Sequence, residues 1–386
     1  MSGRIVILGG GAIGSAVAYF LARIATANER ITVIERDPTY RVASSSLSAS
    51  SIRQQFSTPL NVKLSQFGYD FMRSCVAGDQ LGGAVGLHEC GYMFLARADQ
   101  AGAMKLRTRL VREFGGKVEE FDARKLAERY RWLCCDGIAY AVMGLSGEGW
   151  FDGYMLQQWY RTRAQAGGVE YIRGDVIGLE CTSTKVVSVQ LAGGMSIPAE
   201  RVVNACGPWS AAIARYAGID LPVRARRRSL FVVSCPEALP GFPILVDTSG
   251  VFIRPELQHF LCALSPREER DYDDLPLEPD LELFEDQVWP ALALRVPAFE
   301  ALRVVRAWSG YYEFNVADQN GLVGQIGPEN FYVATGFSGH GLMHSAGIGR
   351  GMAELLTYGE YRQLDLSPLS PQRVHTGRLI VEDAVY

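Results

Sequence analysis

The chain has 386 residues, a length typical of two or three domains. It is 48% hydrophobic and 21% charged, and its 38 Lys and Arg against 42 Asp and Glu leave a net charge of −4. This composition excludes a disordered chain, a collagen-like chain and a strongly basic nucleic-acid-binding chain.

The N-terminal segment has the clearest pattern. Arg4–Leu8 is a short apolar run rich in β-branched residues, as a buried parallel strand requires. Glycines follow this run, then helix formers over residues 15–22 and a second apolar run at Ile31–Glu35. The order of strand, glycine-rich turn, helix and strand predicts one βαβ unit.

The turn in this unit has the glycine spacing of a dinucleotide-binding site. Gly9 allows a sharp turn, Gly11 lets the backbone approach a pyrophosphate, and Gly14 lets the helix pack closely on the strand. Glu35 lies 21 residues after Gly14, where a carboxylate accepts hydrogen bonds from ribose hydroxyls and disfavours a 2′-phosphate. The motif predicts NAD or FAD rather than NADP, and by itself it does not separate the two.

The middle of the chain predicts a mixture of helices and strands. Helices are expected from about residue 58 and over residues 99–114, 154–166 and 281–295. Strands are expected over residues 169–172, 176–179, 186–191, 201–205, 230–233 and 251–253. The local charge block of Arg224, Arg226, Arg227 and Arg228 is expected to be solvated or ion-paired.

A second glycine-rich turn precedes a helix near the C-terminus. Residues 331–335 predict a strand, and the helix after the turn is expected to run to Leu356. The N-terminus of that helix would stabilise the negative charge of a reduced flavin, whereas a nicotinamide has no such need. The turn favours FAD over NAD, although a turn that serves packing alone has the same pattern.

Three ordered motifs resemble the D-amino-acid-oxidase superfamily of FAD-dependent oxidoreductases. They are Gly9–Glu35, residues 204–210 (Asn-Ala-Cys-Gly-Pro-Trp-Ser) and Gly336–Gly341. The resemblance spans nearly the whole chain and is closest to the FOXRED1-like and sarcosine oxidase–dehydrogenase branch, also through residues 51–56 (Ser-Ile-Arg-Gln-Gln-Phe). It implies an α/β fold, with a Rossmann-like FAD-binding domain around a mostly parallel sheet. The substrate domain would contain an antiparallel or mixed sheet and helices.

The resemblance also implies domain boundaries and cofactor contacts. The FAD-binding domain would be assembled from residues 1–80, 150–215 and 316–386, and the substrate domain from residues 81–149 and 216–315. The residues expected at the FAD are Gly9, Gly11, Ala12, Ile13, Gly14, Glu35, Arg36, Ser44, Ser45, Ser46, Val176, Ala205, Gly207, Gly336, Gly339, His340, Gly341, Leu342 and Met343.

Two departures from the family pattern bear on the chemistry. Monomeric sarcosine oxidases have a Lys, which helps the flavin react with oxygen, where this chain has Met343. A slow reaction with oxygen is therefore expected, so the enzyme would be a dehydrogenase that uses another acceptor. No Cys lies near Trp308–Tyr312 and no His lies in residues 44–53, where relatives attach their flavin, so the FAD is expected to be noncovalent.

The implied reaction is oxidation of an amino acid or N-substituted amino acid to the imine, with hydride transfer to flavin N5. Substrates of this class include glycine derivatives, imino acids, opines and D-amino acids. Arg53 aligns with the Arg that binds the substrate carboxylate in sarcosine oxidases, and Arg254 is a second candidate. The alternative for Arg53 is a position at the surface or facing a ribose, and the alternative for Arg254 is an ion pair with Glu256. Tyr311 and His340 are further candidates, with packing or a structural role as their alternatives.

Other functions stay open at this point. One is an NAD-dependent dehydrogenase that uses the first motif alone, and another is a flavin-bearing assembly or partner subunit with little turnover. The electron acceptor is not specified and would be a partner subunit, a quinone or an electron-transfer protein. No metal site is expected, because His88, Glu89 and Cys90 lack further ligands at suitable spacing. The lack of a signal peptide or a membrane-spanning apolar run, and the scattered cysteines, predict a cytoplasmic protein.

Overall fold

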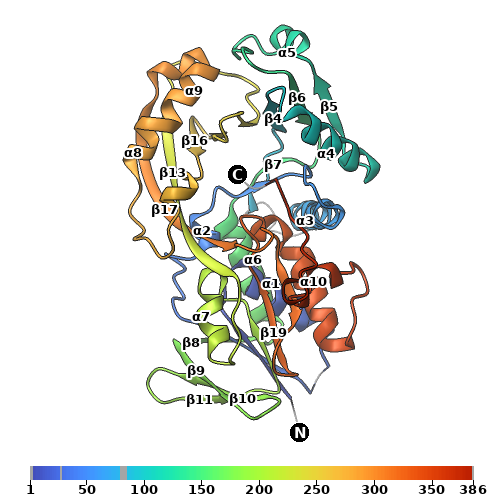
Figure 1. Cartoon of the computed structure of the whole chain (residues 1–386). Coiled ribbons are helices and arrows are strands. Elements are labelled where there is room, and N and C mark those ends of the chain that lie inside the picture. The colour runs from blue at the N-terminus through green and yellow to red at the C-terminus, as the bar shows by residue number, and fades with distance from the viewer. Residues whose placement is uncertain (1–2, 27, 79–84, 385–386) are drawn as a thin grey trace.

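The computed structural model of the chain describes residues 3–26, 28–78 and 85–384. Two large sheets organise the molecule, one in the lower half of Figure 1 and the other in the upper half. Within the described residues, no helix is both long and apolar enough to cross a membrane.

The lower sheet has six strands in the order β18-β19-β12-β1-β2-β8, and all neighbours are parallel except β18 and β19. Its strands are β1 (Arg4–Leu8), β2 (Arg30–Glu35), β8 (Glu170–Arg173), β12 (Arg201–Asn204), β18 (Leu322–Gln325) and β19 (Phe331–Thr335). Ile5 and Ile7 of β1 pack into the core on one face, and Val6 and Leu8 into the core on the other. The apolar run is continuous because both faces of the sheet are covered.

Four long helices share the first of these cores: α1 (Ala12–Ile24), α3 (Pro59–Gly78), α6 (Gly153–Ala166) and α10 (Gly341–Tyr358). The other face is covered by α7 (Ser210–Arg215) and a three-stranded antiparallel sheet of β9 (Val176–Cys181), β10 (Val186–Leu191) and β11 (Ser196–Pro198). Asp152 caps α6 by accepting a hydrogen bond from the Met155 N–H at 2.9 Å.

The upper sheet has eight strands in the order β17-β13-β16-β15-β14-β4-β6-β5. These are β4 (Tyr92–Ala96), β5 (Val118–Phe121), β6 (Tyr140–Gly144), β13 (Val223–Ser234), β14 (Ile244–Val246), β15 (Phe252–Glu256), β16 (His259–Ala263) and β17 (Arg303–Asn315). Only β14 and β4 pair in parallel, so this sheet is mixed. The predicted fold class, with one mostly parallel and one mixed sheet, is confirmed.

The remaining elements complete the upper half and the connection between the halves. They are α2 (Ser44–Leu47), α4 (Ala101–Glu113), α5 (Ala123–Arg129), α8 (Leu281–Leu283), α9 (Trp289–Arg295), α11 (Gln372–His375) and the pair β3 (Ser51–Ile52) and β7 (Gly149–Trp150). The helix expected over residues 281–295 is interrupted by a π-helical turn at Phe284–Val288. The strand expected over residues 230–233 lies near the C-terminal end of the longer β13.

The strands of the six- and three-stranded sheets all come from residues 1–80, 150–215 and 316–386, and those of the eight-stranded sheet from the intervening segments. The domain boundaries themselves stay a prediction, and the one between residues 80 and 81 lies outside the described residues.

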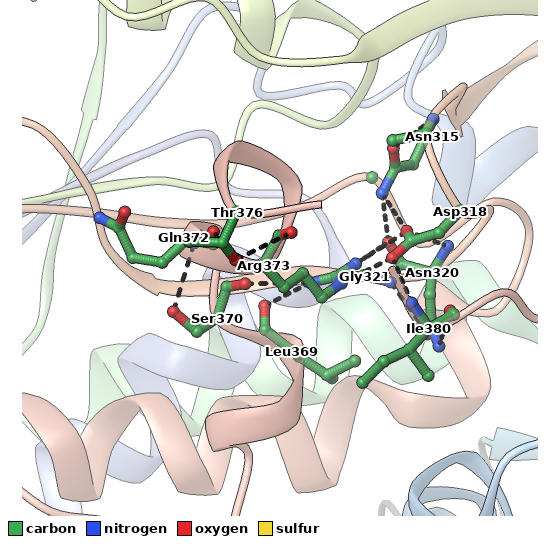
Figure 2. A network of polar contacts seen from close by, with 12 residues as sticks. Asn315, Asp318, Asn320, Gly321, Leu369, Ser370, Gln372, Arg373, Thr376 and Ile380 are labelled. Carbon is green, nitrogen blue, oxygen red and sulfur yellow. Dashed lines mark hydrogen bonds and ion pairs between the residues drawn. The ribbon is translucent and has the colours of Figure 1, made fainter. Parts of the chain in front are cut away.

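A buried polar network ties the C-terminal segment to the loop before β18 (Figure 2). Arg373 donates from Nε to Asp318 Oδ2 at 2.7 Å and from Nη2 to Asp318 Oδ1 at 2.9 Å. Asp318 also accepts from Asn315 Nδ2 at 2.9 Å and from the Ile380 N–H at 3.1 Å. The Arg373 and Asp318 side chains are 5% and 0% exposed, so their charges are compensated within the protein rather than by water.

Replacement of Arg373 is expected to destabilise the fold strongly. Arg373→Met leaves the Asp318 carboxylate charged in the interior, and the free energy of unfolding should fall by roughly 3–5 kcal/mol. Arg362→Met is the control, because Arg362 pairs with Glu360 at the surface, where an ion pair contributes at most about 1 kcal/mol. Denaturant unfolding of both variants measures the difference, and equal losses would contradict this account.

Candidate active site

A cavity of about 300 Å³ is lined by residues from both large sheets. The turn after β1, the end of β2 and the segment after β12 reach it from the lower half. Strands β4, β13 and β17 contribute from the upper half, and the start of α10 also lines it. Residues that are more than 300 positions apart in the sequence, such as Gly9 and Gly339, therefore share one cavity.

The first glycine-rich turn forms one wall. Gly9 has a φ of +90°, and a Cβ there would lie 2.6 Å from the Ala205 carbonyl oxygen, so only glycine fits. A Cβ on Gly11 would meet nothing closer than the Ser45 hydroxyl at 3.9 Å, so the space over Gly11 is open. Gly11 is the N-cap of α1 and makes no side-chain capping bond, which leaves the amides of the first turn available to an anion.

Glu35 closes this wall at the end of β2. Its Oε2 accepts a hydrogen bond from the Gly10 N–H and its Oε1 accepts one from the Asp37 N–H, both at 2.8 Å. Burial raises the pKa of Glu35, while these two hydrogen bonds act in the opposite direction. The guanidinium of Arg36 lies 4.4 Å from the centre of the Trp209 ring, and both residues line the cavity.

The second glycine-rich turn forms another wall. Gly336, Ser338 and Gly339 have positive φ angles of 72°, 46° and 87°. A Cβ on Gly339 would lie 1.8 Å from the Tyr312 hydroxyl, so the tyrosine packs directly on the glycine backbone. His340 is the N-cap of α10 and forms no side-chain cap, and residues 339–343 line the cavity.

The lining fits the predicted FAD. Two helix N-termini, those of α1 and α10, open onto one cavity and offer amides to negative charge at two separate places. Among the described residues, the buried Ser45 Oγ lines the cavity and has no hydrogen-bond partner, as expected for a hydroxyl that binds a coenzyme. Bound FAD supplies a hydride acceptor, and the protein supplies its orientation and the surrounding charge.

Most of the residues predicted to bind the coenzyme line the cavity. They are Gly9, Gly11, Ala12, Ile13, Glu35, Arg36, Ser44, Ser45, Val176, Ala205, Gly207, Gly339, His340, Gly341, Leu342 and Met343. Gly14, Ser46 and Gly336 do not line it. A Cβ on Gly14 would lie 1.9 Å from the Gly9 carbonyl oxygen, so Gly14 serves close packing of α1 on β1.

Arg53 lines the cavity and is 5% exposed. Its guanidinium lies 4.5 Å from the centre of the Phe56 ring, and its Nη2 donates to the Ala384 carbonyl oxygen. His340 lies beside it, with its ring centre 4.9 Å from that of Phe56. Burial and the charge of Arg53 lower the pKa of His340 well below its usual value, so this imidazole is neutral, and its Nε2 has no partner among the described residues.

The other two substrate-site candidates differ in their surroundings. Arg254 does not line the cavity: its Nε donates to the Ala49 carbonyl oxygen at 2.9 Å, and its Nη1 pairs with Glu256. These contacts fit the alternative role of Arg254, an ion pair with Glu256. Tyr311 lines the cavity, but its hydroxyl donates to the Leu275 carbonyl oxygen at 2.9 Å.

The cavity residues that were not predicted from the sequence include Tyr92 on β4, Arg228 on β13 and Glu313 on β17. Arg228 makes a bidentate pair with Asp271, at 2.6 and 3.0 Å. The other arginines of the charge block pair with Asp273 or Asp280, which confirms the expected ion-paired stretch. Glu313 accepts from Thr335 Oγ1 and the Gly336 N–H, both at 3.1 Å, and burial raises its pKa to about 7.

Glu148 supports the segment that carries Arg53. It is 2% exposed, and it accepts hydrogen bonds from the Gln54 N–H and from Gln55 Nε2, both at 2.8 Å. Burial raises the pKa of Glu148 to about 7, against the lowering effects of these bonds and of Arg53. No group of three or more potential metal ligands is found in the described part of the chain.

Gly11→Ala is expected to weaken FAD binding without harming the fold. The new methyl group meets no protein atom closer than 3.9 Å, but it occupies the space where a pyrophosphate would approach the backbone. FAD content after purification should fall, while the melting temperature of the FAD-free protein should stay unchanged. Gly102→Ala in α4, where a Cβ also has open space, is the control and should keep its FAD.

Glu148 is expected to make stability pH-dependent. Because its pKa is about 7 in the folded chain and 4.5 ordinarily, the folded state binds more protons than the unfolded state between these values. The free energy of unfolding should therefore fall as the pH rises from about 4.5 to 7, by roughly 3 kcal/mol from this group.

Unfolding of Glu148→Gln across this pH range tests the assignment, because the variant should lose that part of the pH dependence. Glu329→Gln, at an exposed position, should retain it. An unchanged slope in Glu148→Gln would contradict the assignment.

Comparisons with known proteins agree with the site. The sequence matches the family described as FAD dependent oxidoreductase over residues 4–355. It is 37% identical to FAD-dependent oxidoreductase domain-containing protein 1 of Xenopus laevis, covering 98% of this chain and 84% of that protein. It is 26% identical to mitochondrial dimethylglycine dehydrogenase of Rattus norvegicus, covering 95% of this chain and 44% of that protein.

The fold is similar to that of L-proline dehydrogenase from P. horikoshii. The TM-score is 0.83 at 23% identity, and the match covers 98% of this chain and 99% of that one. Together with the cavity and the family match over residues 4–355, this places the chain in the family of FAD-dependent oxidoreductases, with FAD rather than NAD as its coenzyme.

Proposed function

We propose that the chain oxidises an amino acid or N-substituted amino acid to the imine, with hydride transfer from the carbon beside nitrogen to flavin N5. The proposal rests on the position of Arg53. Its buried guanidinium lies at the wall of the same cavity that residues 339–343, at the second glycine-rich turn, also line. A guanidinium in a desolvated site binds a carboxylate strongly.

The relatives support this substrate class. Curated relatives include dimethylglycine dehydrogenases and a 4-methylaminobutanoate oxidase, whose names specify secondary or tertiary amines that bear a carboxylate. Tyr92, whose ring centre lies 5.8 Å from the Arg53 guanidinium, and Tyr312 both line the cavity, and their rings suit the apolar part of such a substrate. Because His340 is neutral, it adds no positive charge to that of Arg53 near the amine of the substrate.

The proposed acceptor is a molecule other than oxygen. Met343 lines the cavity at the first turn of α10 and brings no positive charge that would stabilise reduced oxygen species beside the flavin. We propose that the enzyme acts as a dehydrogenase and delivers electrons to a quinone, an electron-transfer protein or a partner subunit. The flavin is proposed to be noncovalent.

Anaerobic reduction of the bound flavin tests the function. Sarcosine, dimethylglycine, glycine and both enantiomers of proline should be compared with pyrrolidine, which has the proline ring but no carboxylate. At least one amino acid should bleach the flavin absorbance, and pyrrolidine should do so only at much higher concentration. Failure of every amine would favour a flavin-bearing partner subunit with little turnover instead.

Arg53→Ala should raise the KM of the reactive amino acid by an amount equivalent to about 2–5 kcal/mol. The cause is loss of the guanidinium that pairs with the carboxylate in a site shielded from water. The reaction with pyrrolidine serves as the control and should change little. An unchanged KM for the amino acid would remove Arg53 from the substrate site.

A further inference from the structure

The C-terminal segment over residues 380–384 runs along the molecule with alternate residues buried: Val381 and Asp383 are exposed, whereas Glu382 and Ala384 are buried. In Figure 1 it is the dark red chain that rises towards β7 and α3. The Ile380 N–H donates to Asp318 Oδ2, and the Glu382 N–H donates to the Asp318 carbonyl oxygen, both at 3.1 Å. The network of Figure 2 therefore anchors the start of this segment.

Glu382 is the main anchor of the segment. Its side chain is fully buried, and its carboxylate lies at the first turn of α3. It accepts from Ser57 N–H and Oγ at 2.9 and 2.6 Å, from Thr58 N–H and Oγ1 at 3.2 and 3.0 Å, and from Asn61 Nδ2 at 2.9 Å. Burial raises the pKa of Glu382, but these hydrogen bonds outweigh it and hold the pKa below its usual value. A negative charge at a helix N-terminus is favourable, so this carboxylate is held ionised.

The end of the segment contacts two residues that line the cavity, Arg53 and His340. The Ala384 N–H donates to Glu382 Oε1 at 3.1 Å, which fixes the peptide that follows the glutamate. The Ala384 carbonyl oxygen accepts a hydrogen bond from Arg53 Nη2. His340 also forms a hydrogen bond with the Ala384 backbone, so both Arg53 and His340 contact this residue.

We propose that Glu382 is a positioning residue that orients Arg53, through the Ala384 carbonyl, for binding of the substrate carboxylate. The inference rests on the proposed function in taking Arg53 as the carboxylate-binding group. We expect Glu382 to keep the segment bound in one position rather than to release it during the reaction. Its release would leave a buried carboxylate and the first turn of α3 without their hydrogen bonds, which is costly.

A carboxylate that cannot be oxidised provides the test, because it reports on Arg53 without turnover. The FAD-bound protein is titrated with 2-furoate and separately with the uncharged 2-furamide, and the shift of the flavin absorbance gives each Kd. Glu382→Gln should raise the Kd of 2-furoate about tenfold or more and leave the Kd of 2-furamide unchanged. Asp383→Asn, at the exposed neighbouring position, makes the same change of charge and should alter neither Kd.

Ser57→Ala is the milder variant if Glu382→Gln does not retain FAD. It removes the hydroxyl that donates to Glu382 Oε1 and should raise only the Kd of 2-furoate. Equal weakening of both ligands would indicate a general structural role, and an unchanged Kd of 2-furoate would exclude coupling to Arg53; either result overturns the inference. No binding of 2-furoate to the unsubstituted protein would also overturn it. Binding of 2-furoate without flavin bleaching by any amine would instead count against the proposed function alone.

Discussion

Close packing of α10 on α1 determines where the cavity lies. A Cβ on Gly349 would lie 2.7 Å from the Ala16 Cβ, so the two helices touch at the level of the backbone. Strands β1 and β19 both pair in parallel with β12, so they end at the same edge of the sheet. Each is followed by a glycine-rich turn and one of these helices. The helix contact and the shared edge together bring both N-termini to one cavity, the usual place for a ligand in a sheet of this kind.

The elements that sequence patterns predict best are those in which every local signal agrees. The first βαβ unit and the last strand and helix combine a buried apolar run, required glycines and strong helix formers, and all of them form as expected. Strand β17 was not predicted, because its exposed residues Val304, Val305 and Arg306 break the alternation that marks a half-buried strand. Its long pairing with β13 determines its structure, and a non-local pairing leaves no signal within one segment.

Non-local pairing also explains why some cavity residues were not predicted. Arg228 appears in the sequence as one of a charge block, and only the pairing of β13 with β17 places it beside Tyr312, 5.1 Å from the ring centre. Glu313 has no motif around it, and it reaches Gly336 only in the folded chain. Conversely, the pattern around Arg254 fits two roles equally well, because a following glutamate is compatible with an ion pair and with a free guanidinium.

Two buried carboxylates hold the segment that carries Arg53, and they differ in charge. Glu148 accepts from Gln54 and Gln55 on one side, and Glu382 accepts from Ser57 and Thr58 on the other. With more donors and a helix N-terminus, Glu382 has a lowered pKa, whereas that of Glu148 rises to about 7. The chain thus supports both ends of the segment without placing two full negative charges beside it.

This difference bears on how a guanidinium can bind an anionic ligand. Arg228 is matched by Asp271 in a bidentate pair, and Arg254 by Glu256, so a ligand carboxylate would have to compete with a protein carboxylate at either position. Arg53 donates to the Ala384 carbonyl, and this neutral oxygen orients its guanidinium. At neutral pH Glu148 is only partly ionised, since its pKa is about 7. As the pH rises and Glu148 ionises, the positive potential at Arg53 decreases, and the attraction of the cavity for a carboxylate decreases with it.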